Sequence, residues 1–199
     1  FKGSISLLLT SDEEGIAKYG TIKMLEHIKN YDPKIDFCIL GEPTTREKIG
    51  DTVKIGRRGS VNFTLKINGK QGHVAYPEKA INPMPLIASV LKDLSEYEFD
   101  TGSEYFQKSN LEITSIDTGN FVSNIIPESV TARFNIRFND KHNASSLYKI
   151  VTKILEKHKI QYDLKYENSS NAFIQKYSPM MQNFVRKVED VCKITPNIT

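Results

Sequence analysis

The sequence lacks the features that mark several broad classes of protein. Its 199 residues hold 27 Lys and Arg against 24 Asp and Glu, a net charge of only +3. A nucleic-acid-binding surface needs a clustered basic excess, so this balance predicts no nucleic-acid partner. The apolar run at residues 5–9 is far shorter than the roughly 20 residues that cross a bilayer, so we also expect no membrane partner.

Cysteine is scarce as well. Cys38 and Cys192 are the only two, and they lie too far apart to suggest a disulfide framework or a metal-binding knuckle. This use of cysteine favours a reduced, cytoplasmic setting. What is present is a globular composition, with 39% hydrophobic and 26% charged residues and ordinary amounts of Gly and Pro. The length of 199 residues is enough for one domain or two small ones.

The first 40 residues combine two apolar runs with a helical pattern. The runs cover residues 4–9 and 35–40. Between them an apolar stripe recurs every three residues, at Ile16, Tyr19, Ile22, Leu25 and Ile28. Strand, helix and strand without a polar face predict a βαβ unit of a parallel, doubly covered sheet in an α/β domain. Because the chain begins at Phe1, on the first run, we expect it to be a piece of a longer protein.

The pattern changes after Gly56. Strands are predicted near residues 61–67, 111–116, 130–138 and 162–166, and helices from about residue 82 and near residues 147–155. The order β-α-β-β-α-β predicts a ferredoxin-like unit with two helices on one face of an antiparallel sheet. A last amphipathic helix follows Pro179 and is expected to return to the first domain. We therefore predict three segments, which are a catalytic α/β part at 1–55, an inserted ferredoxin-like lid at 56–168, and a catalytic part at 169–199.

Three acidic residues stand where open α/β sheets place their ligand sites. Glu13 and Glu14 follow the first predicted strand, and Glu42 follows the second. Like charges gathered at neighbouring strand ends are costly unless a cation or a proton neutralises them. The alternative is that they are solvated acids in turns and before helices, where acids are common. The pattern alone leaves both interpretations open.

One histidine and three arginines are further candidates. His73 lies in a turn that contains glycine, where most histidines are ordinary surface residues. Arg57, Arg58 and Arg137 offer guanidinium groups that can bind a carboxylate through two hydrogen bonds. Solvated charge is the alternative for each arginine.

Four motifs in order carry a family resemblance. They are TSDEEG at residues 10–15, LGEPT at 40–44, GRRGS at 56–60 and QGHVAYP at 71–77. Together they resemble the M20 family of dinuclear zinc hydrolases, and the last two resemble its desuccinylase branch. The resemblance implies an α/β catalytic domain that is interrupted by a ferredoxin-like dimerisation lid, in a cytoplasmic homodimer joined through the lid.

The resemblance also implies an activity and its residues. The family branch hydrolyses the amide of N-succinyl-LL-2,6-diaminopimelate, a small-molecule substrate, to succinate and diaminopimelate in lysine biosynthesis. Glu13 matches the general base, Glu14 a ligand of one zinc and Glu42 a ligand of the other. His73 matches the lid histidine that enters the partner subunit's active site and stabilises the oxyanion.

Five polar residues match positions that line the family's substrate pocket. They are Arg57, Arg58, Tyr76, Asn124 and Arg137. Of these, Arg137 is the candidate for the succinyl carboxylate. The chain departs from the pattern at Ser123, where the resemblance predicts a second amide ahead of Asn124, so hydrogen bonds of the pocket are expected to differ there.

The resemblance implies two zinc ions per subunit, with cobalt able to replace them. The family's other metal ligands would lie before Phe1 and after Thr199, so we expect this chain to be inactive and not to retain its metals. Two alternatives stay open. The parent is another M20 amidase, such as an acetylornithine deacetylase or a carboxypeptidase, or the chain is a module that only dimerises.

Overall fold

The computed structural model describes residues 2–15, 17–31 and 34–199. Ile16, which the predicted helical stripe includes, lies outside the described residues. Contacts divide the chain into two units, Phe1–Pro43 and Thr44–Thr199. Within the described residues, no helix has both the length and the apolar character needed to span a membrane.

The larger unit is built on a four-stranded antiparallel sheet. Its strands lie in the order β5 (Asn110–Asp117), β7 (Ser129–Phe138), β3 (Gly59–Asn68) and β8 (Tyr162–Ser170). The two central strands pair over their whole length, from Gly59 opposite Phe138 to Asn68 opposite Ser129. All three strand pairs are antiparallel. This arrangement confirms the predicted ferredoxin-like unit.

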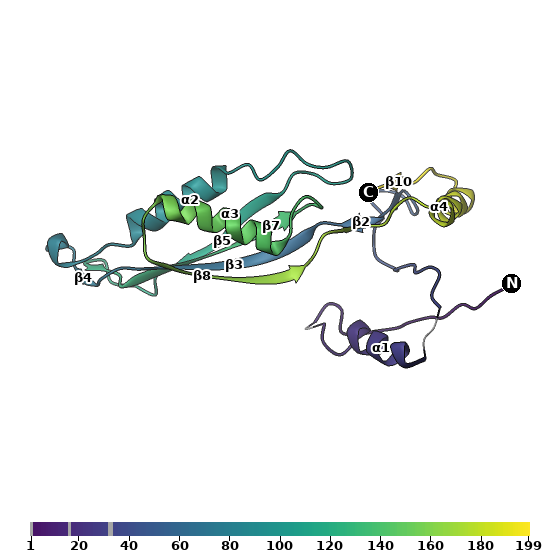
Figure 1. Ribbon diagram of the computed structural model, residues 1–199, viewed down its shortest axis with the longest axis horizontal. Helices are drawn as coiled ribbons and strands as arrows, with labels where there is room; N and C mark the ends of the chain where they lie inside the picture. The colour runs from purple at the N-terminus through teal and green to yellow at the C-terminus, as the bar shows by residue number, and fades with distance from the viewer. Residues whose placement is uncertain (1, 16, 32–33) are drawn as a thin grey trace. The chain divides into compact units, whose positions relative to one another are not determined.

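Two helices cover one face of this sheet. They are α2 (Met84–Glu96) and α3 (Ala144–Lys157), and Figure 1 shows both on the same side of the strands. Asn143 caps α3, because its Oδ1 accepts a hydrogen bond of 2.8 Å from Ser146 N while Ser146 Oγ accepts one of 3.0 Å from Asn143 N. This capping box satisfies backbone donors that the first turn leaves unpaired.

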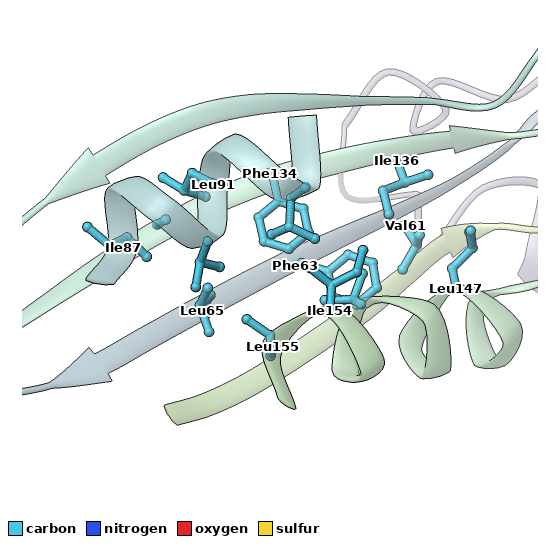
Figure 2. Packing of buried hydrophobic residues seen from close by; sticks show 14 of the residues in the cluster. Val61, Phe63, Leu65, Ile87, Leu91, Phe134, Ile136, Leu147, Ile154 and Leu155 are labelled. Carbon is cyan, nitrogen blue, oxygen red and sulfur yellow. The ribbon is translucent and has the colours of Figure 1, made fainter. Parts of the chain in front are cut away.

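The core lies between the sheet and these helices. Alternate residues of β3 are buried, including Phe63 and Leu65, while Asn62 and Lys66 on the other face are exposed. Phe63 stacks on Phe134 of β7, with ring centroids 5.1 Å apart. Figure 2 shows side chains of both helices and of the sheet meeting around this pair. A strand with one buried face produces this period of two.

Short pairings extend the larger unit beyond the sheet. They are β1 (Thr52–Val53) with β10 (Asn197–Ile198), β2 (Gly56–Arg57) with β9 (Phe173–Ile174), and β4 (Gly72–His73) with β6 (Ile125–Ile126). The larger unit also holds η2 (Pro77–Lys79) and α4 (Pro179–Cys192). The contacts therefore divide the chain before residue 44, whereas the predicted segments divide it after residues 55 and 168.

The smaller unit contains α1 (Thr21–Ile28) and η1 (Lys29–Tyr31). The predicted strands at residues 4–9 and 35–40 are wrong for this chain, because no described residue pairs with either segment. A strand is stabilised by hydrogen bonds to a neighbouring strand. Without such a neighbour, apolar side chains stay exposed, as for Leu7 at 83% and Leu40 at 74%.

The first helix is also shorter than the predicted apolar stripe, which begins at residue 16. Asp12 holds the preceding segment in a turn, because its Oδ2 accepts a hydrogen bond of 2.8 Å from Tyr19 N and its backbone oxygen accepts one of 3.1 Å from Ala17 N. Ala17 has a φ of 53°, in the left-handed region, which interrupts a right-handed helix. The helix therefore begins only at Thr21.

A polar network holds the loop that precedes β5. Asn139 Nδ2 donates to Asp100 Oδ1 at 2.6 Å, Gly102 N donates to the same oxygen at 2.7 Å, and His142 Nε2 lies 3.3 Å from Asp100 Oδ2. Burial by itself raises the pKa of Asp100, but hydrogen bonds from Ser109, Gly102 and Asn139 together lower it by more than burial raises it. The net pKa lies below the ordinary value.

This network predicts a stability effect that depends on pH. Asp100→Asn should lower the free energy of unfolding at pH 7 by about 1–3 kcal/mol, because an amide places N–H groups against N–H donors. Because the folded pKa is lowered, the difference from wild type is present above the unfolded pKa of about 3.9 and disappears as the pH falls through the folded value. Urea unfolding at pH 7 and at pH 3, followed by circular dichroism, measures the difference in unfolding free energy between variant and wild type.

The matched control is Asp140→Asn, an exposed carboxylate of the loop between β7 and α3, which should change the unfolding free energy little at pH 7 or at pH 3. Equal destabilisation by Asp100→Asn at pH 7 and at pH 3 would contradict the assignment of the effect to the carboxylate charge.

Candidate functional site

The candidate general base and metal ligands lie in the smaller unit. Glu13 and Glu14 occupy the turn that begins at Asp12, where Gly15 N donates to Asp12 O at 3.2 Å. Glu42 lies at the end of the unit, and all three glutamates are exposed. Within the part of the chain that the structure describes, their carboxylates make no side-chain hydrogen bond or ion pair. They are therefore available to bind a ligand.

These carboxylates do not complete a metal site. Carboxylate oxygens are suitable zinc donors, but a catalytic zinc takes three protein ligands and a structural zinc takes four. Among the described residues, no group of three or more His, Cys, Asp or Glu side chains could hold a metal ion. The donor chemistry of Glu14 and Glu42 fits zinc, whereas the number of donors that the described chain supplies does not.

Three of the predicted site residues come together where β4 pairs with β6. His73 lies opposite Ile125 in this pairing, and Val74 N donates to Asn124 O at 3.0 Å. The side chains of His73 and Asn124 are adjacent, with Nε2 and Nδ2 3.5 Å apart. The rings of His73 and Tyr76 have centroids 6.0 Å apart. We call His73, Tyr76 and Asn124 the tip cluster.

The three predicted arginines gather at the other end of the sheet. Arg58 Nη1 donates to Asn110 Oδ1 at 2.9 Å and to Lys108 O at 3.3 Å, so this guanidinium holds the start of β5. Arg57 lies over the ring of Phe173, 6.0 Å from its centroid. Arg137 is exposed on β7, beside Asn110 of β5. We call Arg57, Arg58 and Arg137 the arginine cluster.

The strand β3 separates the two clusters. It begins at Gly59, next to the arginine cluster, and ends at Asn68, just before β4. Ten residues at about 3.3 Å per residue give a separation of roughly 30 Å. Figure 1 shows β2 and β4 at opposite ends of the sheet. The predicted pocket residues therefore do not surround one site within the larger unit.

Several contacts around these two clusters involve groups that the sequence motifs did not indicate. Ala75 N donates to His73 Nδ1 at 3.0 Å, and Lys79 Nζ lies 4.8 Å from the centroid of the Tyr76 ring. The hydrogen bond from Ala75 N to His73 Nδ1 could not be predicted from the sequence, because every residue except proline supplies a backbone N–H. A shallow hollow on the open sheet face, with Thr131 and Arg133 in its lining, includes none of the predicted residues.

Comparison with protein families identifies the lid. Residues 55–163 match the family model of the M20 peptidase dimerisation domain. A curated relative from Rickettsia bellii (strain OSU 85-389), named succinyl-diaminopimelate desuccinylase, is 51% identical over all of this chain and 52% of its own length. A relative of the same name from Orientia tsutsugamushi (strain Boryong) is 54% identical over all of this chain and 51% of its own. The chain spans about half the length of these relatives.

Solved structures show the same fold. Human carnosine dipeptidase 1 matches 94% of this chain and 52% of its own length with a TM-score of 0.66 at 15% identity. An M20 family metallo-carboxypeptidase from Sulfolobus solfataricus matches 74% of this chain and 52% of its own length with a TM-score of 0.61 at 11% identity. At such identities the likeness concerns the fold alone.

The donor count predicts weak metal retention. The 199-residue chain, loaded with zinc and dialysed, should keep far less than two zinc ions per chain, because Glu14 and Glu42 leave each ion with too few ligands. Elemental analysis against protein concentration measures this. A Glu14→Gln, Glu42→Gln double variant is the control and should retain about as little. Two tightly held equivalents in wild type alone would show that the chain completes the site.

Proposed function

The chain belongs to the M20 peptidase family, and on this premise we propose that its full-length protein is a succinyl-diaminopimelate desuccinylase. The reaction is hydrolysis of N-succinyl-LL-2,6-diaminopimelate to succinate and diaminopimelate. The observation that carries the proposal is identity of 51% and 54%, over the whole chain, to relatives of that name. The two motifs typical of the desuccinylase branch, at residues 56–60 and 71–77, support it.

Family membership implies metal-dependent hydrolysis. We propose zinc as the metal, with cobalt able to replace it, and Glu14 and Glu42 as one ligand each from this chain. The two free cysteines agree with a cytoplasmic setting, which is part of the proposal.

Glu13 is the proposed general base. Its exposed carboxylate has no competing partner among the described residues, so it is free to take the proton of the attacking water. The water oxygen then bonds to the amide carbon, and Glu13 passes the proton to the departing amine. Such proton transfer contributes about 10²–10⁴-fold to the rate.

Arg137 is the proposed partner of the succinyl carboxylate. It is exposed on β7, and its guanidinium makes no hydrogen bond or ion pair with the residues that the structure describes. A guanidinium binds a carboxylate through two parallel hydrogen bonds. Arg58 is bound to Asn110 and Lys108, so we assign it to shaping this end of the sheet rather than to direct substrate binding.

The distance between the two clusters supports a site that is shared between subunits. A succinyl group has only two CH2 groups between its carboxylate and its amide carbon, so residues that hold those two ends must be neighbours. Arg137 and His73 of one chain are kept apart by β3, which is roughly 30 Å long. His73 therefore serves the site of the partner subunit in a homodimer that forms through the lid.

The role of Glu13 predicts a loss of turnover without loss of metal. In the full-length protein, Glu13→Gln should lower kcat by about 10²–10⁴-fold or more, because an amide cannot accept the proton. Glu98→Gln, an exposed glutamate of the larger unit, is the control and should keep wild-type turnover. Release of diaminopimelate measures turnover, and elemental analysis measures the metal.

Two results would count against this proposal. Wild-type turnover in Glu13→Gln, or loss of its metal, would remove the assigned role. Faster hydrolysis of acetyl than of succinyl amides by the wild-type protein would favour another M20 amidase.

The shared site predicts complementation between two inactive variants. In a heterodimer of full-length His73→Ala and Glu13→Gln subunits, one of the two sites has an intact base and an intact histidine. Each homodimer should be about 10²-fold or more below wild type, whereas the purified heterodimer should approach half of wild-type activity. Differently tagged subunits, co-expressed and purified through both tags, provide the heterodimer.

A site within one subunit gives the opposite result, because each heterodimer site then carries one defect. No recovery of activity in a verified heterodimer would therefore show that His73 does not act in the active site of the partner subunit. Wild-type subunits carrying the two tags are the control for the tagging itself.

A further inference from the structure

A β-bulge in the edge strand β5 changes which of its side chains face away from the helices. The pairing of β5 with β7 shifts register between Ile113 and Ser115, so Thr114 is the extra residue. Ile113 and Ile116 both lie opposite buried residues of β7, although residues three apart in a regular strand point to opposite faces. The bulge therefore turns the end of β5 over, and bulges commonly re-aim side chains in this way beside functional sites.

The residues after the bulge share the open face of the sheet with two residues of β7. Ser115 lies opposite Arg133 in the register. Asp117 lies opposite Thr131, and all four residues line one hollow of about 210 Å³. Thr114 Oγ1 donates a hydrogen bond of 3.1 Å to the backbone oxygen of Arg133, which holds the bulge against β7. The bulge thus brings a guanidinium, a carboxylate and two hydroxyls to one place.

The two charges of this hollow have no charged partner in the part of the chain that the structure describes. Arg133 and Asp117 form no ion pair there, either with each other or with another side chain. Asp117 Oδ1 accepts a hydrogen bond of 2.8 Å from Gly119 N, which fixes the carboxylate and leaves Oδ2 available. Diagonal neighbours on two antiparallel strands are about 7–8 Å apart, so one small ligand can bridge the two charges.

The pair of opposite charges selects the chemical class of that ligand. A simple carboxylate or phosphate would be attracted by Arg133 but repelled by Asp117, and a simple amine would meet the reverse. A zwitterion satisfies both groups, because its carboxylate accepts two parallel hydrogen bonds from the guanidinium while its ammonium donates to Asp117 Oδ2. In a free α-amino acid the carboxylate and the ammonium are attached to the same carbon, which suits two charges on neighbouring strands.

We infer that this hollow is a binding site for the α-carboxylate and the α-ammonium of a free amino acid. The hydroxyls of Ser115 and Thr131 are further donors to the carboxylate. None of the residues of the arginine cluster or the tip cluster lines the hollow, so the inference is independent of the proposed function. Because Arg133 and Asp117 are exposed, water competes for both charges and the affinity is modest.

The binding test uses the 199-residue chain, without added metal so that no zinc-bound amino acid contributes, and L-alanine as the probe. In ¹H–¹⁵N spectra, alanine should shift the amide signals of residues 115–119 and 129–133, and the shifts should saturate and give a Kd. Arg133→Gln should raise this Kd by about tenfold or more, because charge-assisted hydrogen bonds to the carboxylate are lost.

A second variant, Asp117→Asn, decides between a zwitterion and a simple anion. Its amide oxygen can still accept the hydrogen bond from Gly119 N, so the turn is kept and only the charge is removed. Alanine binding should weaken by about tenfold, because the ammonium loses a charged acceptor. At a site for a simple anion the same change would tighten binding. Acetate and methylammonium, each added alone, should bind about tenfold more weakly than alanine or worse.

The matched control is Lys165→Gln, which removes one positive charge from the same face of the sheet outside the hollow. Lys165 and Arg133 both lie opposite Thr64, on its two sides, and Lys165 is exposed. This variant should bind alanine with the Kd of the wild type. Circular dichroism of all three variants, compared with wild type, confirms that each is folded.

Three outcomes would overturn the inference. The first is an absence of saturable shifts at residues 115–119 and 129–133. The second is wild-type alanine affinity in Arg133→Gln. The third is tighter alanine binding in Asp117→Asn, or acetate binding equal to that of alanine, either of which would show a simple anion site. Succinyl hydrolysis by the full-length protein tests the proposed function separately, so failure of one leaves the other standing.

Discussion

The pairing of β3 with β7 is the constraint on which the larger unit depends. These strands pair residue by residue from Gly59 opposite Phe138 to Asn68 opposite Ser129. Side chains alternate between the faces, so a slip by one residue would move Phe63 and its buried neighbours to solvent. Burial against α2 and α3 therefore fixes the register. The register in turn determines where the chain leaves the sheet at each end.

The candidate site follows from those two exits. At one end the chain enters β3 from β2, where the arginine cluster lies, and at the other it passes to β4, where the tip cluster lies. A rigid paired strand of roughly 30 Å keeps the clusters apart. The groups that we propose for the two ends of a short substrate therefore lie at opposite ends of the sheet in one chain and cannot meet there. Two-fold assembly through the lid would bring one chain's tip to another chain's arginines.

The smaller unit shows that a local apolar run does not form a strand by itself. Residues 4–9 and 35–40 have the composition of buried parallel strands, yet Leu7 and Leu40 are exposed. Parallel strands need neighbours on both sides and cover on both faces, and no described residue pairs with these segments. A metal site likewise depends on residues beyond the local motif. Glu14 and Glu42 are suitable zinc ligands, but the described residues do not supply enough further ligands beside them.

The sequence by itself determined the ferredoxin-like unit and the identity of the candidate residues. The apolar faces of β3, β7, α2 and α3 cover one another within the same segment, so the periods of two and 3.6 residues were sufficient to predict these elements. Only the tertiary structure decided that His73 and Arg137 lie at opposite ends of β3, and that Ala75 N bonds to His73 Nδ1. An apolar pattern reports which face is buried, whereas distances between loops and the partners of backbone N–H groups depend on strand pairing between residues far apart in the chain.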